Sequence, residues 1–312
     1  MSREQIPIPS TNVPLKKNRK AKGFQILTPW LFLIPALIII TLFLIIPIVE
    51  AFIWSLQDYK LIAQSGEFVG LENFKKIFTD ELFWRALLNT ILFVLFVLPL
   101  NIFLPMILAA LVNQKIRAAG MFRVLYYLPV VTPMVVAALM WRMLYSESGF
   151  LAKFLYEIGL FDRPTNLLVQ SSTALFAVAM ITVWKGLGYY MMMYLAGLQN
   201  ISKDLYEAAS IDGASKLQSF WKITVPMLIP YSTLVSVLTI INGLKVFEEI
   251  QLTTNGGPAG ATTTLVMYIF NKFMDLDVSI ASAAGIVLLI LAVAASLLQM
   301  KLTSKREEDL RG

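Results

Sequence analysis

The stretch EAASIDGASKLQSFWKITVPMLIP, Glu207–Pro230, lies between two long apolar segments and begins with small and polar residues that favour a helix. Ser202 precedes it where a helix N-cap is expected, and Gly213 permits the left-handed backbone that ends a helix. Ser215 then begins a capping box for a second helix. The pattern therefore predicts two short helices, the first over 203–211, that meet at a sharp corner.

The composition places this corner in a membrane protein. The chain has 312 residues, of which 57% are hydrophobic and 15% are charged, and the charges cluster between apolar runs of about 20 residues. Runs of that length cross a bilayer as helices. We therefore expect an all-α, polytopic membrane protein. The predicted spans cover about 29–55, 87–112, 124–145, 173–198, 228–250 and 279–300.

Lysine and arginine residues predict the orientation of the spans. Segments on the side of the N-terminus hold twice as many of them as segments on the opposite side, and basic loops tend to stay in the cytoplasm. Residues 1–23 are therefore expected to form a basic cytoplasmic tail, followed by a transmembrane domain over 24–300. The loop 199–227 and the tail 301–312 are expected to face the cytoplasm as well.

Several kinds of chemistry are excluded by residue types that the sequence lacks. It has no cysteine and no histidine, so it offers neither a zinc site of the usual kind nor a Ser-His triad. It also lacks the G-x-x-x-x-G-K-[ST] loop that binds nucleotide phosphates. The net charge of +6 is explained by basic loops, without nucleic acid as a partner. We expect no cofactor in this chain and no catalytic residues, so that the chain alone is not an enzyme.

The spacing within 199–227 fits an ordinary helical connector and a docking surface for a soluble partner equally well. Its sequence resembles the EAA loop of bacterial ABC importer permeases, in which EAA is followed shortly by DGA and then by an apolar stretch that ends in proline. The matching residues are Glu207, Ala208, Ala209, Asp212, Gly213, Ala214, Phe220, Ile223, Pro226 and Pro230.

The resemblance continues along most of the chain and narrows to the sugar-uptake branch, the type of the maltose and glycerol-3-phosphate permeases. It implies a type I ABC importer permease fold with six transmembrane helices. Within the last matching stretch, NGGPAG predicts a turn that leads into a surface or re-entrant helix around 261–273. The matching stretches are GLENFKKIF (Gly70–Phe78), the pair Asn89-Thr90, FRVLYYLPVVTP (Phe122–Pro133), WKGLGYYMMMYLAGLQNI (Trp184–Ile201) and LTTNGGPAGATTTLVMYIF (Leu252–Phe270).

The resemblance also implies partners. They are a second, different permease in a heterodimer, two copies of a cytosolic ABC ATPase that bind ATP and Mg, and an extracytoplasmic solute-binding protein. The location implied is the bacterial cytoplasmic (inner) membrane. Asp212 is expected to hold the corner through local backbone bonds. The residues implied to couple the chain to the ATPase are Glu207, Ala208, Ala209, Asp212, Gly213 and Ala214.

Polar and aromatic residues inside the predicted spans indicate where a substrate would pass. Lys185 is expected to face the bundle interior or water, because a charge facing lipid is unfavourable. Gly186 and Gly188 are expected to weaken their helix, and Lys245 and Glu248 are spaced to pair on one helix face. Aromatic rings beside hydroxyl and amide groups suit sugars, although ordinary helix packing explains any one of these residues equally well.

The resemblance to the maltose permease implies a set of substrate contacts. Val130 and Met134 are apolar where that permease is expected to be polar, so the sugar itself stays open. We expect import of a carbohydrate, most simply a disaccharide or oligosaccharide. Import of a polyol or glycerol phosphate by the same mechanism and a stand-alone secondary transporter are the alternatives. The implied substrate-binding residues are Trp184, Gly186, Tyr189, Thr239, Asn242, Gly243 and Val246.

Overall fold

The computed structural model describes residues 30, 32–114 and 119–311, with side chains described as far as Lys301. The basic tail predicted over 1–23 lies outside the described residues. The chain divides at Glu50 into two units. In the first unit an apolar helix begins at Phe32, contains the π-helical segment η1 (Thr41–Ile45), and continues as α2 (Ile46–Ser55) into the second. Its 24 residues are enough to cross a bilayer.

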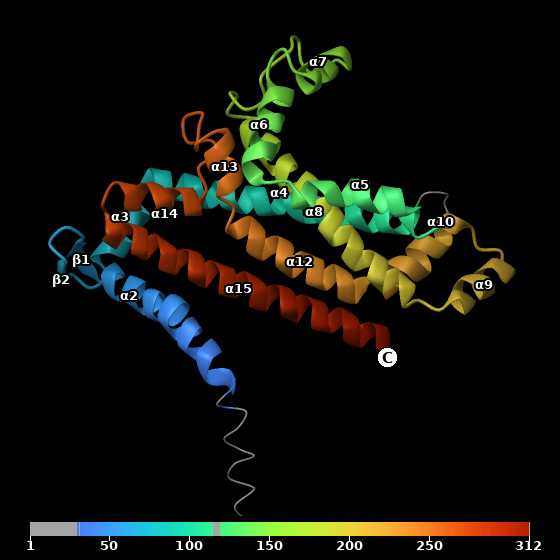
Figure 1. The fold of residues 1–312 in the computed structure, drawn as a ribbon, viewed down its shortest axis with the longest axis horizontal. Coiled ribbons are helices and arrows are strands. Elements are labelled where there is room, and N and C mark those ends of the chain that lie inside the picture. Colours follow the sequence, from blue (N-terminus) through green and yellow to red (C-terminus); the bar gives the residue numbers. More distant parts are fainter. Residues whose placement is uncertain (1–29, 31, 115–118, 312) are drawn as a thin grey trace, which may run out of the picture. The chain divides into compact units, whose positions relative to one another are not determined.

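The second unit, from residue 51 onward, holds the other helices (Figure 1). The long ones lie side by side, α4 and α8 share the most extensive contact, and α12 packs on both α4 and α15. The elements are β1 (Gln57–Lys60), β2 (Ser65–Phe68), α3 (Glu72–Thr79), α4 (Glu81–Val112), α5 (Ala119–Val131), α6 (Met134–Tyr145), α7 (Phe150–Glu157), α8 (Ala174–Gln199), α9 (Lys203–Ile211), α10 (Lys216–Ser219), η2 (Phe220–Thr224), α11 (Val225–Met227), α12 (Ile229–Leu244), α13 (Glu248–Thr253), α14 (Leu265–Met274) and α15 (Val278–Arg311).

The described helices supply four candidate spans, and up to six if each of two bent pairs counts as one. The first pair bends by 100° between α5 and α6, within the single span predicted over 124–145. Pro133 explains this break, because proline has no amide hydrogen with which to continue α5. The second pair bends by 66° at the entry to α12. The helix α12 ends at Leu244, whereas the sequence predicted one span as far as 250.

Helix α8 runs without interruption from Ala174 to Gln199, so Gly186 and Gly188 do not break it. Gly188 is buried, and a Cβ atom there would collide with the backbone oxygen of Tyr126 in α5. Glycine is therefore needed at position 188 because two helix backbones approach closely there. The same close approach would be lost with any larger residue.

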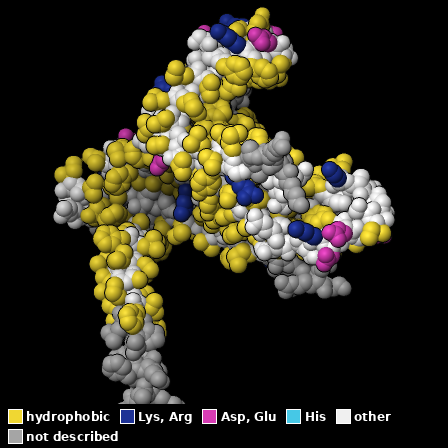
Figure 2. Space-filling view, turned by 45° about the vertical axis from the view of Figure 1, so that its right-hand side comes forward, with side chains coloured by type: hydrophobic (Ala, Val, Ile, Leu, Met, Phe, Trp, Pro, Cys, Tyr) yellow, Lys and Arg dark blue, Asp and Glu magenta, His cyan; other side chains and the backbone are white. Residues whose placement is uncertain are grey.

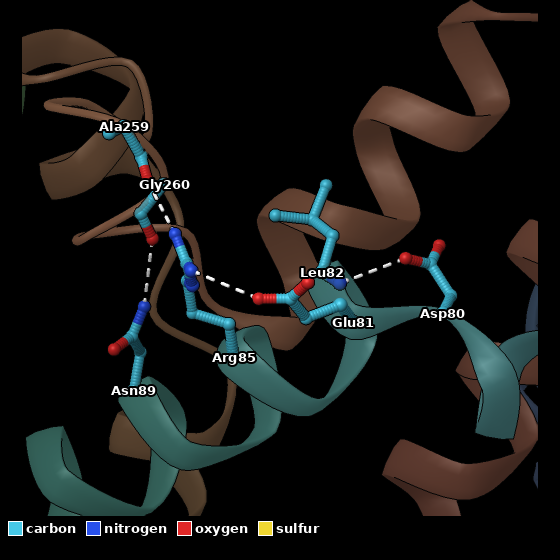
Figure 3. A network of polar contacts seen from close by, with 7 residues as sticks. All are labelled: Asp80, Glu81, Leu82, Arg85, Asn89, Ala259 and Gly260. Carbon is cyan, nitrogen blue, oxygen red and sulfur yellow. Dashed lines mark hydrogen bonds and ion pairs between the residues drawn. The ribbon is translucent and has the colours of Figure 1, made fainter.

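The first turns of α4 hold the segment between α13 and α14 through a set of hydrogen bonds (Figure 3). Asn89 Nδ2 donates to the carbonyl oxygens of Gly260, at 3.0 Å, and Thr263, at 2.9 Å. Arg85 Nη1 donates to the carbonyl oxygen of Ala259 at 2.8 Å. The NGGPAG turn is thus fastened to α4 rather than free on the surface.

The start of α14 is tied to the same helix. The amide of Leu265 donates to Thr90 Oγ1 at 2.9 Å, and the Tyr268 hydroxyl donates to Asp80 Oδ2 at 2.7 Å. Lys272 Nζ lies 3.6 Å from Asp80 Oδ2. We call these contacts, together with those of Asn89 and Arg85, the α4–α14 network. The helix predicted around 261–273 is confirmed as α14.

The antiparallel pair β1 and β2 was not predicted. The two strands are short and mostly polar, without an alternating apolar pattern that would mark them in the sequence. The backbone of Gln64 turns the chain between them with a φ of 49°. Figure 2 shows hydrophobic side chains over most of the visible helical surface, with charged side chains gathered near α9 and near α7.

Candidate functional site

A cavity of about 570 Å³ lies among α4, α5, α8, α12 and the segment that follows α12. Its walls combine aromatic, amide, hydroxyl and charged groups. The polar and aromatic residues that line it are Asn101, Thr182, Lys185, Tyr189, Tyr190, Thr239, Asn242, Lys245, Phe247, Glu248 and Glu249, and the remaining ones are Val97, Val130, Gly186, Gly243, Val246 and Val266.

Most of the predicted substrate residues lie in the wall of this cavity. On each of the two helices, these residues are spaced three or four positions apart, which places them on one face of that helix. Their role in binding stays a prediction, but they share one space. These residues are Gly186 and Tyr189 on α8, and Thr239, Asn242, Gly243 and Val246 on or directly after α12.

Trp184 is the exception. It does not line the cavity, and its ring packs edge-on against Trp141 with 5.7 Å between the ring centroids. Two residues along a helix correspond to a rotation of about 200°, so Trp184 and Gly186 point in nearly opposite directions. Placing Trp184 with the other predicted contacts is therefore wrong, and its packing role is to join α6 to α8.

Lys185 faces the protein interior, as its position in a predicted span required. Its Nζ donates to the carbonyl oxygen of Thr132 at 2.7 Å. That carbonyl lies at the break between α5 and α6, where the last turn of a helix has no intrahelical partners. A cation is favourable at this end of a helix. Lys185 therefore satisfies the broken backbone on one side of the cavity.

Lys245 and Glu248 both line the cavity, but the prediction that they pair is wrong. Both residues are described, and no salt bridge joins them. The helix ends at Leu244 and α13 begins at Glu248, so the regular spacing that would align the two side chains is interrupted. With Lys185 and Glu249, the cavity wall holds two cationic and two anionic residues.

Asn101 and Thr182 are cavity residues that the sequence reasoning missed. A signal was available for Asn101, since it is an amide in the middle of the apolar run 87–112, where polar groups are unfavourable unless they serve a purpose. Thr182 lies one turn before Gly186 on the lining face of α8. Among the described residues, the side-chain oxygens of Asn101 and Thr239 are buried and have no hydrogen-bond partner.

The corner predicted after 203–211 is present. Ser202 Oγ accepts the amide hydrogen of Asp204 at 3.3 Å, and Gly213 has a φ of 79°. Ser215 and Gln218 form the predicted capping box, with both hydrogen bonds in place. The two helices and their caps are therefore confirmed.

The backbone, and not the Asp212 carboxylate, holds this corner. The amide of Ala214 donates to the oxygen of Ala209 at 2.9 Å, and the amide of Gly213 donates to the oxygen of Ser210 at 3.1 Å. These two bonds form a Schellman motif. The amide of Asp212 also donates to the oxygen of Ala208, at 3.0 Å, so Asp212 takes part in the corner through a local backbone bond, and none of the described hydrogen bonds involves its side chain.

The residues proposed to contact an ATPase lie on an accessible surface. Glu207, Ala208, Asp212 and Gly213 are exposed, while Ala209 and Ala214 are half-buried. A hydrogen bond of 2.8 Å joins the hydroxyls of Tyr206 and Thr224, so α9 is fixed to the π-helical segment η2. Figure 1 shows α9 and α10 at one end of the long helices, with α3 and α14 at the other.

Comparisons with known proteins agree with this arrangement. Residues 83–307 match the family model described as binding-protein-dependent transport system inner membrane component. The chain is 36% identical over 285 residues to the probable ABC transporter permease protein YurN of Bacillus subtilis (strain 168), covering 90% of this chain and 97% of the relative. It is 33% identical over 292 residues to the lactose transport system permease protein LacF of Rhizobium radiobacter, covering 92% and 97%.

Among solved structures, the fold matches a bacterial ABC transporter involved in the import of the acidic polysaccharide alginate. The TM-score is 0.78 at 25% sequence identity, and the match covers 92% of this chain and 99% of that chain. The family match includes the cavity helices α8 and α12, the EAA corner and the NGGPAG turn. The chain therefore belongs to the family of inner membrane components of binding-protein-dependent transport systems, the permease subunits of ABC importers.

Proposed function

We propose that this chain is the permease subunit through which an uncharged carbohydrate passes in an ATP-driven importer of the bacterial cytoplasmic membrane. A second permease completes the pathway, a solute-binding protein delivers the substrate, and two cytosolic ATPases bind ATP and Mg. The observation that carries the proposal is the cavity of about 570 Å³ between α4, α8 and α12, whose wall combines tyrosine rings with amide and hydroxyl groups. Such groups bind sugar C–H faces and hydroxyls.

The charges of the cavity favour a neutral substrate over an anionic one. A phosphate or carboxylate would be attracted by Lys185 and Lys245, and this keeps glycerol phosphate as the second candidate. Glu248 and Glu249 line the same cavity and oppose an anion, and Lys185 already donates to the carbonyl oxygen of Thr132. The alternative of a stand-alone secondary transporter is disfavoured, because the family consists of components of binding-protein-dependent transport systems.

The α9 corner is the proposed contact with the ATPase. A coupling element has to transmit force, so it must resist bending relative to the membrane helices. The Schellman motif, the capping box and the bond between Tyr206 and Thr224 supply that stiffness. Glu207 offers a charge on the exposed face, and Ala208 with Gly213 permits close approach of another backbone.

The substrate is tested by deleting the gene for this chain and restoring it on a plasmid. Uptake of radiolabelled lactose, maltose, trehalose and glycerol 3-phosphate is measured in both strains. We expect the deletion to abolish uptake of one neutral sugar and the plasmid to restore it. Dependence of glycerol 3-phosphate uptake alone would support the second candidate. Uptake of all four compounds without the gene, at undiminished rates, would contradict the proposal.

The coupling corner is tested with Glu207→Ala, and Ser210→Ala on the same exposed helix is the matched control. Loss of a charge pair at an interface leaves one charge unpaired, so ATPase stimulation by the loaded binding protein should fall about tenfold. The control should retain stimulation. Both are measured in the purified complex reconstituted into vesicles. Equal stimulation in the two variants, with equal amounts of assembled complex, would remove Glu207 from the contact.

A further inference from the structure

Helix α4 contributes a polar side chain to the cavity that no resemblance indicated. Asn101 lies between Pro99 and Pro105 on this helix and is 2% exposed. It lines the cavity together with Val97, one turn earlier. Its Oδ1 is buried and has no hydrogen-bond partner among the described residues.

An unpaired carbonyl at this depth requires an explanation. Buried polar groups in native proteins are nearly always hydrogen-bonded, and each exception needs an explanation, such as a functional role or a bound group that completes the pairing. Within a membrane bundle the requirement is stricter, because lipid supplies no hydrogen bonds. The buried Oδ1 of Asn101 is therefore unfavourable in the substrate-free protein, and no hydrogen bond within the described part of the chain compensates for it.

A second unpaired group faces the same cavity from another helix. Thr239 on α12 is 1% exposed, and its Oγ1 also has no partner among the described residues. On α8, Gly186 keeps the space beside Asn101 open, because a Cβ atom there would lie 3.5 Å from Asn101 Oδ1 and 2.9 Å from the ring of Tyr190. Three helices thus leave room next to two polar groups that lack partners.

The chemistry of these groups identifies what would satisfy them. A carbonyl oxygen accepts a hydrogen bond, and a hydroxyl group both donates and accepts. A substrate hydroxyl can therefore donate to Asn101 and pair with Thr239, whereas an ionised phosphate or carboxylate oxygen has no hydrogen to donate to the amide carbonyl. We propose that Asn101 binds a hydroxyl group of the transported carbohydrate and is a specificity-determining residue of the pathway. The proposal rests on the proposed function, since it names a contact within the same cavity.

The test compares Asn101→Leu with Asn89→Leu. Leucine has the same number and branching of side-chain heavy atoms as asparagine and removes its hydrogen-bonding groups. Both asparagines lie on α4 and are buried, but Asn89 Nδ2 already donates to Gly260 and Thr263. The two measurements are the thermal unfolding temperature of the purified, substrate-free importer complex and the uptake rate of the radiolabelled sugars lactose, maltose and trehalose in cells with equal amounts of complex.

We expect opposite results in the two measurements for Asn101→Leu. The unfolding temperature should stay equal or rise, because a buried carbonyl oxygen without a partner is removed. Uptake of the transported sugar should fall about tenfold, the effect of one hydrogen bond in a site that excludes water. Asn89→Leu should instead lower the unfolding temperature. A drop in unfolding temperature for Asn101→Leu, or unchanged uptake, would overturn the role of Asn101.

Failure of the proposed function would look different. In that case the unaltered chain would support uptake of none of the sugars, whatever the residue at position 101. If the unaltered chain transports a sugar and Asn101→Leu transports it equally well, the carbohydrate function holds and only the contact at Asn101 is wrong. A residue of the second permease that pairs with Asn101 would be revealed by a lower unfolding temperature of the Asn101→Leu complex, and that result also counts against the proposal.

Discussion

Asn89 and Asn101 lie about three turns apart on α4 and are both buried, yet they are used in opposite ways. Asn89 donates two hydrogen bonds to backbone oxygens of the segment before α14. Asn101 faces a cavity and leaves its Oδ1 without a partner among the described residues. The comparison teaches that a polar residue in an apolar span can have two roles. It can join one element to another, or it can bind a ligand, and the presence or absence of hydrogen bonds within the protein distinguishes the two.

The largest expected effect on stability is at Asn89, the hydrogen-bonded asparagine. Asn89→Leu removes two hydrogen bonds and leaves the oxygens of Gly260 and Thr263 without this donor, which should cost about 2–4 kcal/mol. The measurement is thermal unfolding of the purified complex. Asn89→Asp serves as a control that keeps the side-chain volume but not the donor, and it should be destabilised as well. Unchanged stability in both variants would mean that the α4–α14 network does not hold the NGGPAG turn.

A smaller loss is expected for Asp80→Asn in the same network. Burial raises the pKa of the Asp80 carboxyl, but hydrogen bonds from Tyr268 and the Leu82 amide and the charge of Lys272 outweigh it, so the pKa is held below its usual value. Removing the charge should cost about 1–2 kcal/mol at neutral pH.

The same substitution has a defined pH dependence. Because the pKa of Asp80 is lower in the folded protein, its contribution is fully present above the usual pKa of about 4 and is lost as the pH falls through the lowered value. The difference in unfolding temperature between the unaltered protein and Asp80→Asn should therefore be constant from pH 8 to about pH 5 and shrink in more acidic solution. A difference that grows on acidification would contradict the assignment.

The smallest effect, with the opposite sign, is expected in the cavity. Thr239→Val keeps the shape of the side chain and removes a buried hydroxyl that has no partner among the described residues, so the substrate-free complex should gain roughly 0.5–1 kcal/mol of stability. Sugar uptake should fall at the same time. Thermal unfolding is measured on the purified substrate-free complex, and sugar uptake is measured in cells. A loss of stability would place Thr239 with Asn89 among the structural residues and would contradict the distinction between hydrogen-bonded and unpaired polar groups.

Much of the site was predictable because the chain resembles a known family. Tyr189 and Asn242 were assigned from resemblance to a family, and each lies on the cavity-lining face of its helix. Trp184 was misplaced because resemblance gives a position in the chain but not the direction of the side chain, and its ring packs on Trp141. The pairing of Lys245 with Glu248 failed for a related reason, since it assumed a continuous helix through the end of α12.

The sequence by itself determined the apolar helices and the capped corner at α9. Both are local, because hydropathy acts within one segment and a cap joins residues a few positions apart, such as Ser215 and Gln218. Only the tertiary structure decided which polar groups are paired. Asn89 finds its acceptors 171 and 174 residues further along the chain, whereas Asn101 finds none among the described residues. Partners at such distances are set by how the helices pack, and no local pattern in the sequence records them.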